Sequence, residues 1–288
     1  MKLGVILFQN RPYPDLKRIA QRLDTSLWNT LWIPDEFQGD GVWHECWSVL
    51  ASVAETTSRI RLGSLVTPIM LHHPALLAKR AITVDHIADG RIELGLGGGV
   101  RSAQDRIYKT LNFRDWAPKE RVDRFEEQVK IIRELVAGRQ ITFNGEYYQT
   151  EECRLIPSPV QKPSIPITIG AIGKRMMTIS VKYADRWNSY CSSEKSLQEV
   201  VEVIGGRLQF ILETCDELER SPSTLIKSAL ALGRFWRDTF SSMENFESIV
   251  NAFCDIGLDE LILYFPFDLK LIDTFWSVTE NLSITKFI

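Results

Sequence analysis

The sequence of 288 residues has few cysteines and histidines, and their spacing excludes the common disulfide and metal patterns. The five cysteines are odd in number, scattered, and never spaced as CxxC. This is the usage of a reducing compartment and not of a disulfide framework. The four histidines form no HExxH motif, and no group of His, Cys and carboxylate residues has zinc spacing. We therefore predict no metal site and a cytoplasmic protein.

An excess of one charge and long apolar runs are also lacking. The formal net charge is -3, which gives no reason to expect nucleic acid or an anionic membrane as partner. No apolar run approaches the roughly 20 residues of a membrane span. The N-terminal apolar stretch is too short for a signal peptide and ends at Pro12, so we interpret it as a first strand. We expect a small-molecule substrate, and a homodimer is one assembly that the sequence permits.

What the sequence does contain is a regular alternation of short β-type runs and longer amphipathic segments. It implies parallel strands joined by right-handed crossovers. Eight such units, in a chain close to the typical ~250 residues, predict an α/β domain over residues 1–288, folded as a (β/α)8 TIM barrel. An open doubly wound sheet is the alternative. The predicted strands are Leu3–Phe8, Thr30–Pro34, Arg61–Val66, Ile92–Leu96, Ile165–Ile169, Asp185–Tyr190, Lys227–Leu232 and Glu260–Phe265. The predicted helices are Asp15–Leu23, Trp43–Thr57, Ala75–Ala88, Lys119–Ala137, Lys174–Tyr183, Lys195–Leu218, Met243–Ile256 and Leu269–Leu282.

One connection interrupts this alternation, between the fourth helix and the fifth strand. Residues Gly138–Ser164 contain three prolines, with β-type residues over Gln140–Tyr148. Connections of this length are uncommon and often functional. We predict an insertion made of a small hairpin followed by an extended proline stretch.

Barrel enzymes place catalytic groups on the loops that follow the strands. After the second strand, Asp35 and Glu36 could hold the polar edge of a cofactor or move a proton, and His44 could titrate near neutral pH. An acidic helix start, with Asp40 or Gly41 near its cap, explains the same residues equally well.

A glycine-rich run follows the fourth strand and includes Gly97, Gly98 and Gly99. Such a run exposes backbone N–H groups and lets a ligand approach closely. It is not a dinucleotide fingerprint, because Val100 stands in the place of the third glycine and three strands already precede it. A tight turn is the alternative, but the glycines exceed what one turn needs, which favours ligand contact.

The turn after the fifth strand consists of Gly170, Ala171, Ile172 and Gly173 and leads into a helix that begins with two cations. A helix start of this kind binds anions such as phosphate through backbone amides. An ordinary helix start is the alternative, but cations in the first turn oppose the helix dipole, which favours a bound anion.

Two further segments are ambiguous. Gly233–Arg237, after the seventh strand, carries two cations and two aromatic residues, which suit stacking, anion contact or a solvated rim. His72 and His73 precede Pro74, and we assign them to the start of a helix. Adjacent side chains diverge, which argues against a shared metal.

Seven segments of the sequence occur in a characteristic order: Leu62–Pro68, His73–Lys79, Asp89–Gly99, Gly145–Tyr148, Pro157–Pro163, Pro166–Gly170 and Ala184–Asn188. This ordered set closely resembles the luciferase-like flavin monooxygenase superfamily, over roughly residues 1–190. The resemblance implies a (β/α)8 barrel with an insertion. It also implies an oxidoreductase or monooxygenase that uses FMN or the deazaflavin coenzyme F420 in its C-terminal mouth.

The resemblance also implies residue roles at the tip of the second strand. In the F420-dependent branch this tip usually consists of an aspartate followed by a histidine. Here Asp35 matches, whereas Glu36 replaces the histidine that often transfers a proton, so the role falls to Glu36 or His44. A carboxylate that often follows the glycine run is replaced by Val100.

The cofactor contacts that the resemblance implies lie on the third, fourth and fifth strands. Relatives commonly have a non-proline cis peptide on the third strand that supports the flavin ring. The matching bond is Ser64–Leu65, with Thr67 close by. Ile172-Gly173 matches the site of the cofactor phosphate.

Three functions follow from these observations. The first is a flavin- or F420-dependent oxidoreductase that acts by hydride transfer or O2 activation. The second is a non-catalytic flavin-binding relative that has lost its acid/base groups, as Glu36 and Val100 suggest. The third is a barrel hydrolase that uses Asp35 and Glu36. It is disfavoured because adjacent side chains diverge, whereas glycoside cleavage needs carboxyls facing each other across about 5 Å or more.

Overall fold

The computed structural model of the chain describes residues 1–36, 44–99 and 110–281. Trp43 and Leu282, at the ends of two predicted helices, lie outside these ranges. The proposed cap residues Asp40 and Gly41 and the substituted position Val100 lie outside them as well.

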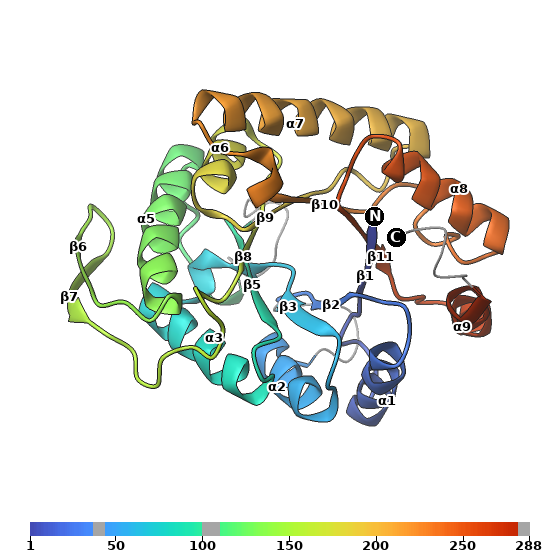
Figure 1. Cartoon of the computed structure of the whole chain (residues 1–288), viewed down its shortest axis with the longest axis horizontal. Helices are drawn as coiled ribbons and strands as arrows, with labels where there is room; N and C mark the ends of the chain where they lie inside the picture. Colours follow the sequence, from blue (N-terminus) through green and yellow to red (C-terminus); the bar gives the residue numbers. More distant parts are fainter. Residues whose placement is uncertain (37–43, 100–109, 282–288) are drawn as a thin grey trace.

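Eight parallel strands form a closed barrel, which confirms the (β/α)8 prediction and excludes the open sheet (Figure 1). Neighbours follow in the order β3-β2-β1-β11-β10-β9-β8-β5, and pairing of β3 with β5 closes the ring. A two-residue strand, β4 (Thr67–Pro68), follows β3 and also pairs with β5. The eight strands are β1 (Lys2–Ile6), β2 (Thr30–Ile33), β3 (Arg61–Ser64), β5 (Ile92–Gly97), β8 (Ile167–Gly170), β9 (Arg186–Ser189), β10 (Ile226–Leu230) and β11 (Glu260–Tyr264).

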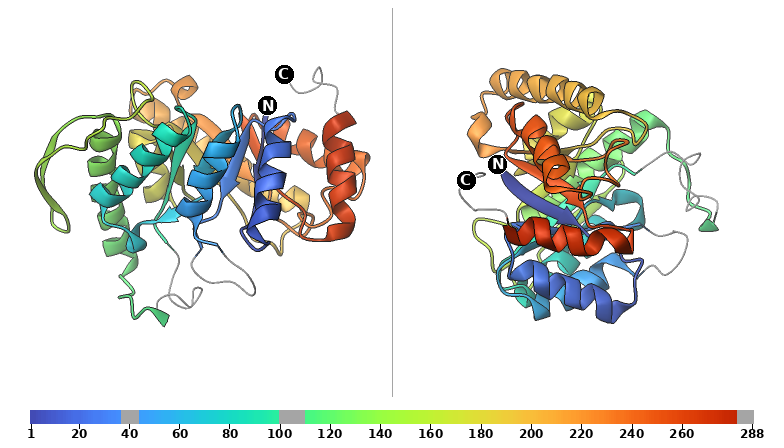
Figure 2. Two further views of the ribbon diagram at one scale, coloured as in Figure 1. Left: turned by 90° about the horizontal axis from the view of Figure 1, so that it is seen from below. Right: turned by 90° about the vertical axis from the view of Figure 1, so that its right-hand side faces the viewer.

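Helices surround the barrel on all sides (Figure 1). The last one, α9, lies beside the first one, α1, so the first and last β/α units meet (Figure 2). Arg22 of α1 joins them, because its guanidinium stacks 4.0 Å from the ring centroid of Trp276. The last predicted helix begins as a 3-10 turn, and its α-helical part starts at Ile272. The helices are α1 (Tyr13–Asp24), α2 (Cys46–Thr56), α3 (Pro74–Ile87), α5 (Pro118–Val136), α6 (Lys174–Tyr183), α7 (Leu197–Glu217), α8 (Met243–Cys254) and α9 (Ile272–Asn281).

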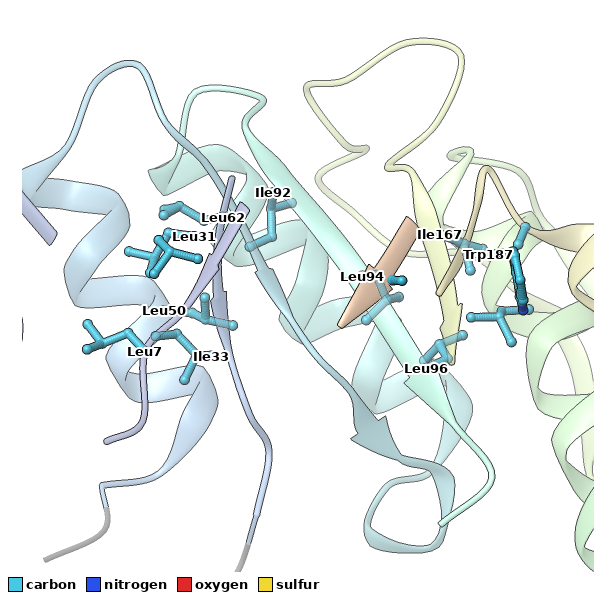
Figure 3. Close-up of a cluster of buried hydrophobic side chains, with 14 of the residues drawn as sticks. Leu7, Leu31, Ile33, Leu50, Leu62, Ile92, Leu94, Leu96, Ile167 and Trp187 are labelled. Carbon is cyan, nitrogen blue, oxygen red and sulfur yellow. The ribbon is translucent and has the colours of Figure 1, made fainter. Parts of the chain in front are cut away.

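The main hydrophobic core lies between the strands and the helices. Successive residues of a strand point to opposite faces. In β2, Leu31 and Ile33 face outward and belong to the same buried cluster as Leu50 of α2 (Figure 3). Trp32, between them, belongs instead to a second cluster with Tyr264 inside the barrel. The mostly apolar strand sequences are therefore explained by burial on both faces.

The N-terminal half of the barrel interior holds a buried ion network that the sequence analysis did not identify. Arg186, the first residue of β9, pairs with Glu93 of β5 and with Glu260 of β11, and its Nε lies 3.1 Å from Glu93 Oε2. Arg61 Nε lies 2.8 Å from Glu93 Oε1. Burial opposes ionisation of Glu93, but the two guanidinium groups outweigh it and hold the pKa of Glu93 below its ordinary value. In the sequence, the position of Glu93 between two apolar residues of a predicted strand was the one sign of this network.

The predicted insertion is confirmed. Its hairpin consists of the antiparallel strands β6 (Ile141–Asn144) and β7 (Gln149–Cys153), beside α5 (Figure 1). The carboxylate of Glu127 in α5 accepts hydrogen bonds of 2.8 to 3.0 Å from the amides of residues 146–148 in its turn. Asp85 of α3 accepts amide hydrogen bonds from the proline stretch in the same way. The insertion is therefore anchored to two helices, and Gln161 also bonds to Arg61 of β3 and to the carbonyl of Ile92 of β5.

Candidate functional site

The site lies at the C-terminal ends of the strands, and the third strand has its non-proline cis peptide there. The cis bond is Leu65–Val66, so the prediction of Ser64–Leu65 is wrong by one bond. The backbone explains the difference. The amide of Leu65 still donates to the carbonyl of Ile33 at 2.9 Å. The ladder with β2 therefore extends through Leu65, and the chain leaves the strand only after it.

Glycines on β5 and β8 make room for the segment around this bond. A Cβ on Gly97 would lie 2.4 Å from Cγ2 of Val66, and one on Gly170 would lie 3.3 Å from Cγ1 of the same residue. Gly97 is therefore required by packing against Val66, whereas a side chain at Gly170 would make a tight contact with it. Gly98 and Gly99 lie beyond the strand, and Gly99 has a φ of 72°, which favours glycine. Ligand contact by any of the four stays a prediction.

Two predicted cofactor contacts, Ser64 and Thr67, have fully buried side chains. Ser64 Oγ donates to the carbonyl of Gly95 at 3.0 Å. Thr67 Oγ1 accepts from the indole of Trp47 at 3.2 Å. Both hydroxyls thus hold the β3–β4 segment in place, so any cofactor contact there falls to the backbone.

The start of α6 is open. Gly173 precedes the helix without a side-chain capping bond, and a Cβ at this position would meet no atom within 4 Å. The first N–H groups of a helix have no partner within the helix, so they are available to an anion. The two cations of the first turn are occupied elsewhere. Lys174 lies over the ring of Phe210, and Arg175 Nη2 lies 2.6 Å from a carboxylate oxygen of Asp123. An anion here would be held by backbone amides, and the cations are explained without one.

Of the remaining residues in this turn, Ala171 is buried and Ile172 is exposed. The carbonyl of Ala171 accepts a hydrogen bond from the indole of Trp187 at 2.9 Å, which fixes the turn after β8. The turn therefore presents Ile172 and Gly173 outward on a fixed base.

The two carboxylates at the tip of β2 have different surroundings. Asp35 Oδ2 lies 3.5 Å from Nε2 of His72, in the segment that leads into α3. Both atoms are buried and have no hydrogen-bond partner. The Asp35 carboxylate also lies close enough to Cys46 of α2 to add to the effect of burial, which raises the pKa of that thiol. Asp35 is therefore directed between the barrel wall and the helices.

The contacts of His72 determine its tautomer. Its Nδ1 lies 3.0 Å from Nη1 of Arg80. Arginine only donates hydrogen bonds, so Nδ1 is the acceptor and the ring proton is on Nε2, facing Asp35. Gln128 of α5 fixes the backbone, since its amide nitrogen lies 3.2 Å from the carbonyl of His72. Its neighbour His73 caps α3 by accepting from the amide of Ala75, which confirms the helix start.

Glu36, the residue after Asp35, lies within electrostatic range of the barrel mouth. Its carboxylate contributes, after burial, to raising the pKa of the phenol of Tyr264, the last residue of β11. Tyr264 belongs to the cluster inside the barrel. Glu36 and Tyr264 thus lie close enough to interact electrostatically. The sequence analysis missed this carboxylate–phenol pair because the two residues lie at opposite ends of the chain.

His44 lies at the other side of the β2–α2 connection. Its Nε2 is 3.1 Å from the carbonyl of Arg11, and its ring stands edge-on to Tyr13 at 6.3 Å. Its described contacts are with the β1–α1 segment, and none is with Glu36 or Asp35.

Four aromatic side chains form a continuous wall on one side of the mouth. Tyr264 stacks on Phe8 at 5.8 Å and contacts Trp236 at 4.7 Å. Phe267 closes the cycle, with centroids 5.0 Å from Phe8 and 5.4 Å from Trp236. These residues follow or end β1, β10 and β11, which are neighbours in the barrel. We call Phe8, Trp236, Tyr264 and Phe267 the aromatic wall. The sequence analysis noted only Trp236, through the segment after the seventh strand.

Within residues 1–36, 44–99 and 110–281, no three His, Cys, Asp or Glu side chains come together in a way that could hold a metal ion. Over the same ranges no helix combines the length and the apolar character that a membrane span requires.

Residues 1–207 match the luciferase-like monooxygenase family. The chain belongs to this family. The F420-dependent hydroxymycolic acid dehydrogenase of Mycobacterium tuberculosis is 34% identical over 192 residues, which are 64% of this chain and 51% of that protein. The F420-dependent glucose-6-phosphate dehydrogenase of Amycolatopsis mediterranei is 28% identical over 258 residues, which are 83% of this chain and 74% of that protein.

Solved structures agree with this assignment at the level of the fold. An F420-dependent secondary alcohol dehydrogenase, determined in complex with an F420-acetone adduct, matches with a TM-score of 0.77 at 19% identity. The match covers 96% of this chain and 97% of that one. The chain spans about half the length of the mycobacterial relative.

Proposed function

We propose that this luciferase-like protein is an oxidoreductase that binds coenzyme F420 or FMN at the C-terminal mouth of its barrel and acts on a small organic substrate. The observation that carries the proposal is the open start of α6. Gly173 leaves the first helical amides uncapped, with empty space in front of them. A cofactor phosphate fits such a site, because the helix dipole and the unpaired N–H groups both favour an anion.

The residues available to the cofactor divide into two groups. Gly98, Gly99, Ile172 and Gly173 would hold the phosphate side through the backbone. The backbone of Leu65 and Gly97 would support the ring, because the Ser64 and Thr67 hydroxyls are already engaged. The names of the relatives favour F420 over FMN.

When bound, the cofactor supplies the hydride chemistry, or reacts with O2 if it is FMN. The protein must then exchange a proton with the substrate. We assign this role to Glu36, since its carboxylate lies near enough to the Tyr264 phenol to help raise the pKa of that group. The Tyr264 phenol, whose pKa is raised by burial and by Glu36, stays protonated and can donate a hydrogen bond to a substrate oxygen.

His44 and Asp35 have weaker support as catalytic groups. Asp35 is paired with His72, and His44 contacts the carbonyl of Arg11. We propose that Asp35 fixes the tip of β2, while Glu36 exchanges the proton with the substrate. A binding protein without activity would need no carboxylate–phenol pair there.

The test is a titration with both cofactors. We expect saturable quenching of F420 fluorescence, and a weaker or equal response with FMN. Absence of saturable binding of either cofactor below the millimolar range would overturn the proposal. Steady-state turnover of the loaded protein then separates an enzyme from a binding protein.

Three features of the whole protein belong to the same proposal. Residues 1–288 would form a single domain, the chain would pair as a homodimer, and it would act in the cytoplasm. Size-exclusion chromatography with light scattering tests the second of these.

A further inference from the structure

The substrate side of the mouth has an apolar lining. The aromatic wall packs on the cluster inside the barrel, whose buried members include Ile6, Trp32, Leu65 and Ile262. Phe267 is 41% exposed, and Phe8 and Trp236 are partly buried, so the wall presents ring surface to solvent. Contiguous exposed aromatic surface of this kind marks a place where an apolar ligand can bind.

The polar groups at this wall are few and chemically specific. The phenol of Tyr264 belongs to the wall and to the cluster inside the barrel, and the carboxylate of Glu36 lies within electrostatic range of it. The cations on the nearby segment are already engaged. Arg237 stacks on the Trp236 ring at 4.9 Å, and Arg234 Nη2 lies 3.7 Å from the carboxylate of Glu199. Arg11, which lines the same pocket as Phe8 and Phe267, donates to the carbonyl of Pro266 and lies over the Phe265 ring. A phosphate monoester placed here would lose water and would have to compete for cations that already have partners, and this carries a high cost.

We propose that the aromatic wall binds the hydrocarbon part of an uncharged alcohol or ketone, with the substrate oxygen directed to Tyr264 and Glu36, and that it rejects sugar phosphates. This inference rests on the proposed function and specifies its substrate class. A flat aromatic surface suits a cyclic or branched hydrocarbon, because burial of apolar area drives the binding.

The reaction balances with the proposed cofactor as the only co-reactant. Oxidation of a secondary alcohol breaks its carbinol C–H and O–H bonds and forms the C=O bond. The hydride would go to the oxidised F420, and the hydroxyl proton would go to the Glu36 carboxylate and from there to solvent. The ketone leaves, and the reverse reaction follows the same path with reduced F420.

The first experiment measures binding without turnover. Saturation-transfer NMR with cyclohexanone as the probe should show transfer from aromatic protein protons to the ligand. Trp236→Ala should abolish this signal, and Trp236→Phe should retain it, because phenylalanine keeps a ring at the wall. Phe267→Ala changes an exposed residue and serves as a second variant in case Trp236→Ala does not fold. An unchanged signal in both alanine variants would overturn the proposal.

The second experiment compares substrates for the F420-loaded protein. We expect kcat/KM for cyclohexanol to exceed that for glucose 6-phosphate by at least about 100-fold, and Trp236→Ala to raise KM for cyclohexanol about tenfold with F420 affinity unchanged. Equal or better use of glucose 6-phosphate would overturn this inference and leave the proposed function intact. Failure to bind F420 would overturn the proposed function, while the NMR result would still decide whether the wall binds an apolar ligand.

Discussion

The carbonyl oxygen of Ser64 lies where a side chain on Gly95 would have to be: an added Cβ would lie 1.8 Å from it. The two residues also exchange hydrogen bonds, since the amide of Gly95 donates to Ser64 Oγ at 3.2 Å. β3 and β5 thus approach each other at the mouth more closely than any other residue at position 95 would permit.

Gly95→Ala should therefore destabilise the fold by about 3 kcal/mol or more, because neither the strand carbonyl nor the Cβ can move away cheaply. Gly173→Ala is the matched control, since its Cβ would meet no atom within 4 Å, and it should cost no more than about 1 kcal/mol. Urea unfolding followed by circular dichroism measures both. Similar stability of the two variants would contradict the close approach of β3 and β5.

Gly173→Asp should separate cofactor binding from stability. Aspartate is a good N-cap residue, so the fold should be at least as stable as the wild type. Its charge would repel a cofactor phosphate by roughly 2–4 kcal/mol, which weakens binding about 30- to 1000-fold. Gly173→Asn has the same shape and no charge, and it should retain most of the affinity. Equal affinity of both variants for F420 would place the phosphate elsewhere.

Glu36→Gln and His44→Ala should differ in turnover. Loss of the Glu36 carboxylate should lower kcat by about 100-fold or more, as expected for a general acid/base group. His44→Ala should change kcat less than about threefold, because the imidazole contacts the carbonyl of Arg11. This effect is much smaller than the loss expected for a general acid/base group. Thermal melting checks that both variants fold. Full turnover by Glu36→Gln would remove the carboxylate from the mechanism.

His72 should carry its ring proton on Nε2, because Nδ1 accepts from Arg80. The nitrogen chemical shifts of labelled histidine report the tautomer directly. A proton on Nδ1 would contradict the contact with Arg80. His72→Gln should lower stability by about 1–3 kcal/mol, because Asp35 would keep a poorer partner in a buried place. The affinity for F420 should stay within about threefold of that of the wild type, because Asp35 is directed away from the mouth. This corresponds to a change of less than about 1 kcal/mol in the binding free energy.

Stability should fall in acid because of Glu93. The pKa of Glu93 is lowered in the folded protein from an ordinary value of 4.5, owing to Arg186 and Arg61 outweighing burial. Its contribution to stability is therefore complete above about pH 5, and it is lost as the pH falls through the folded-state pKa. Glu93→Gln should lower the free energy of unfolding by about 3 kcal/mol at pH 7. Between about pH 5 and 3 the stability of this variant should fall less than that of the wild type. Urea unfolding across this range measures both, and parallel curves for the two proteins would contradict the assignment.

The sequence was sufficient for the architecture because the relevant signals are local. Alternating β-type and amphipathic runs predicted all eight barrel strands, and the prolines together with β-type residues predicted the hairpin insertion at Gly138–Ser164. Element ends were less predictable. The β3 strand ends at Ser64 and not at Val66, because the departure from the ladder depends on which amide last reaches the neighbouring strand.

The candidate site was predicted only in part, because its residues converge from distant positions. The strand-tip glycines were visible in the sequence, but the packing of Val66 against Gly97 and Gly170 became evident only in the closed barrel. In the sequence Asp35 and Glu36 are an adjacent acidic pair with no sign of different roles. Their different surroundings depend on residues that only the closed barrel brings near them, His72 for Asp35 and Tyr264 for Glu36.

The sequence alone therefore determined the class of fold and the strand ends at which chemistry can occur, since both follow from hydrophobic period and turn composition. The tertiary structure decided which groups meet. Barrel closure brings Tyr264 of the last strand to Glu36 of the second, sets His72 against Asp35, and assembles four rings into one wall. Contacts of this kind depend on long-range geometry, which no local pattern of residues encodes.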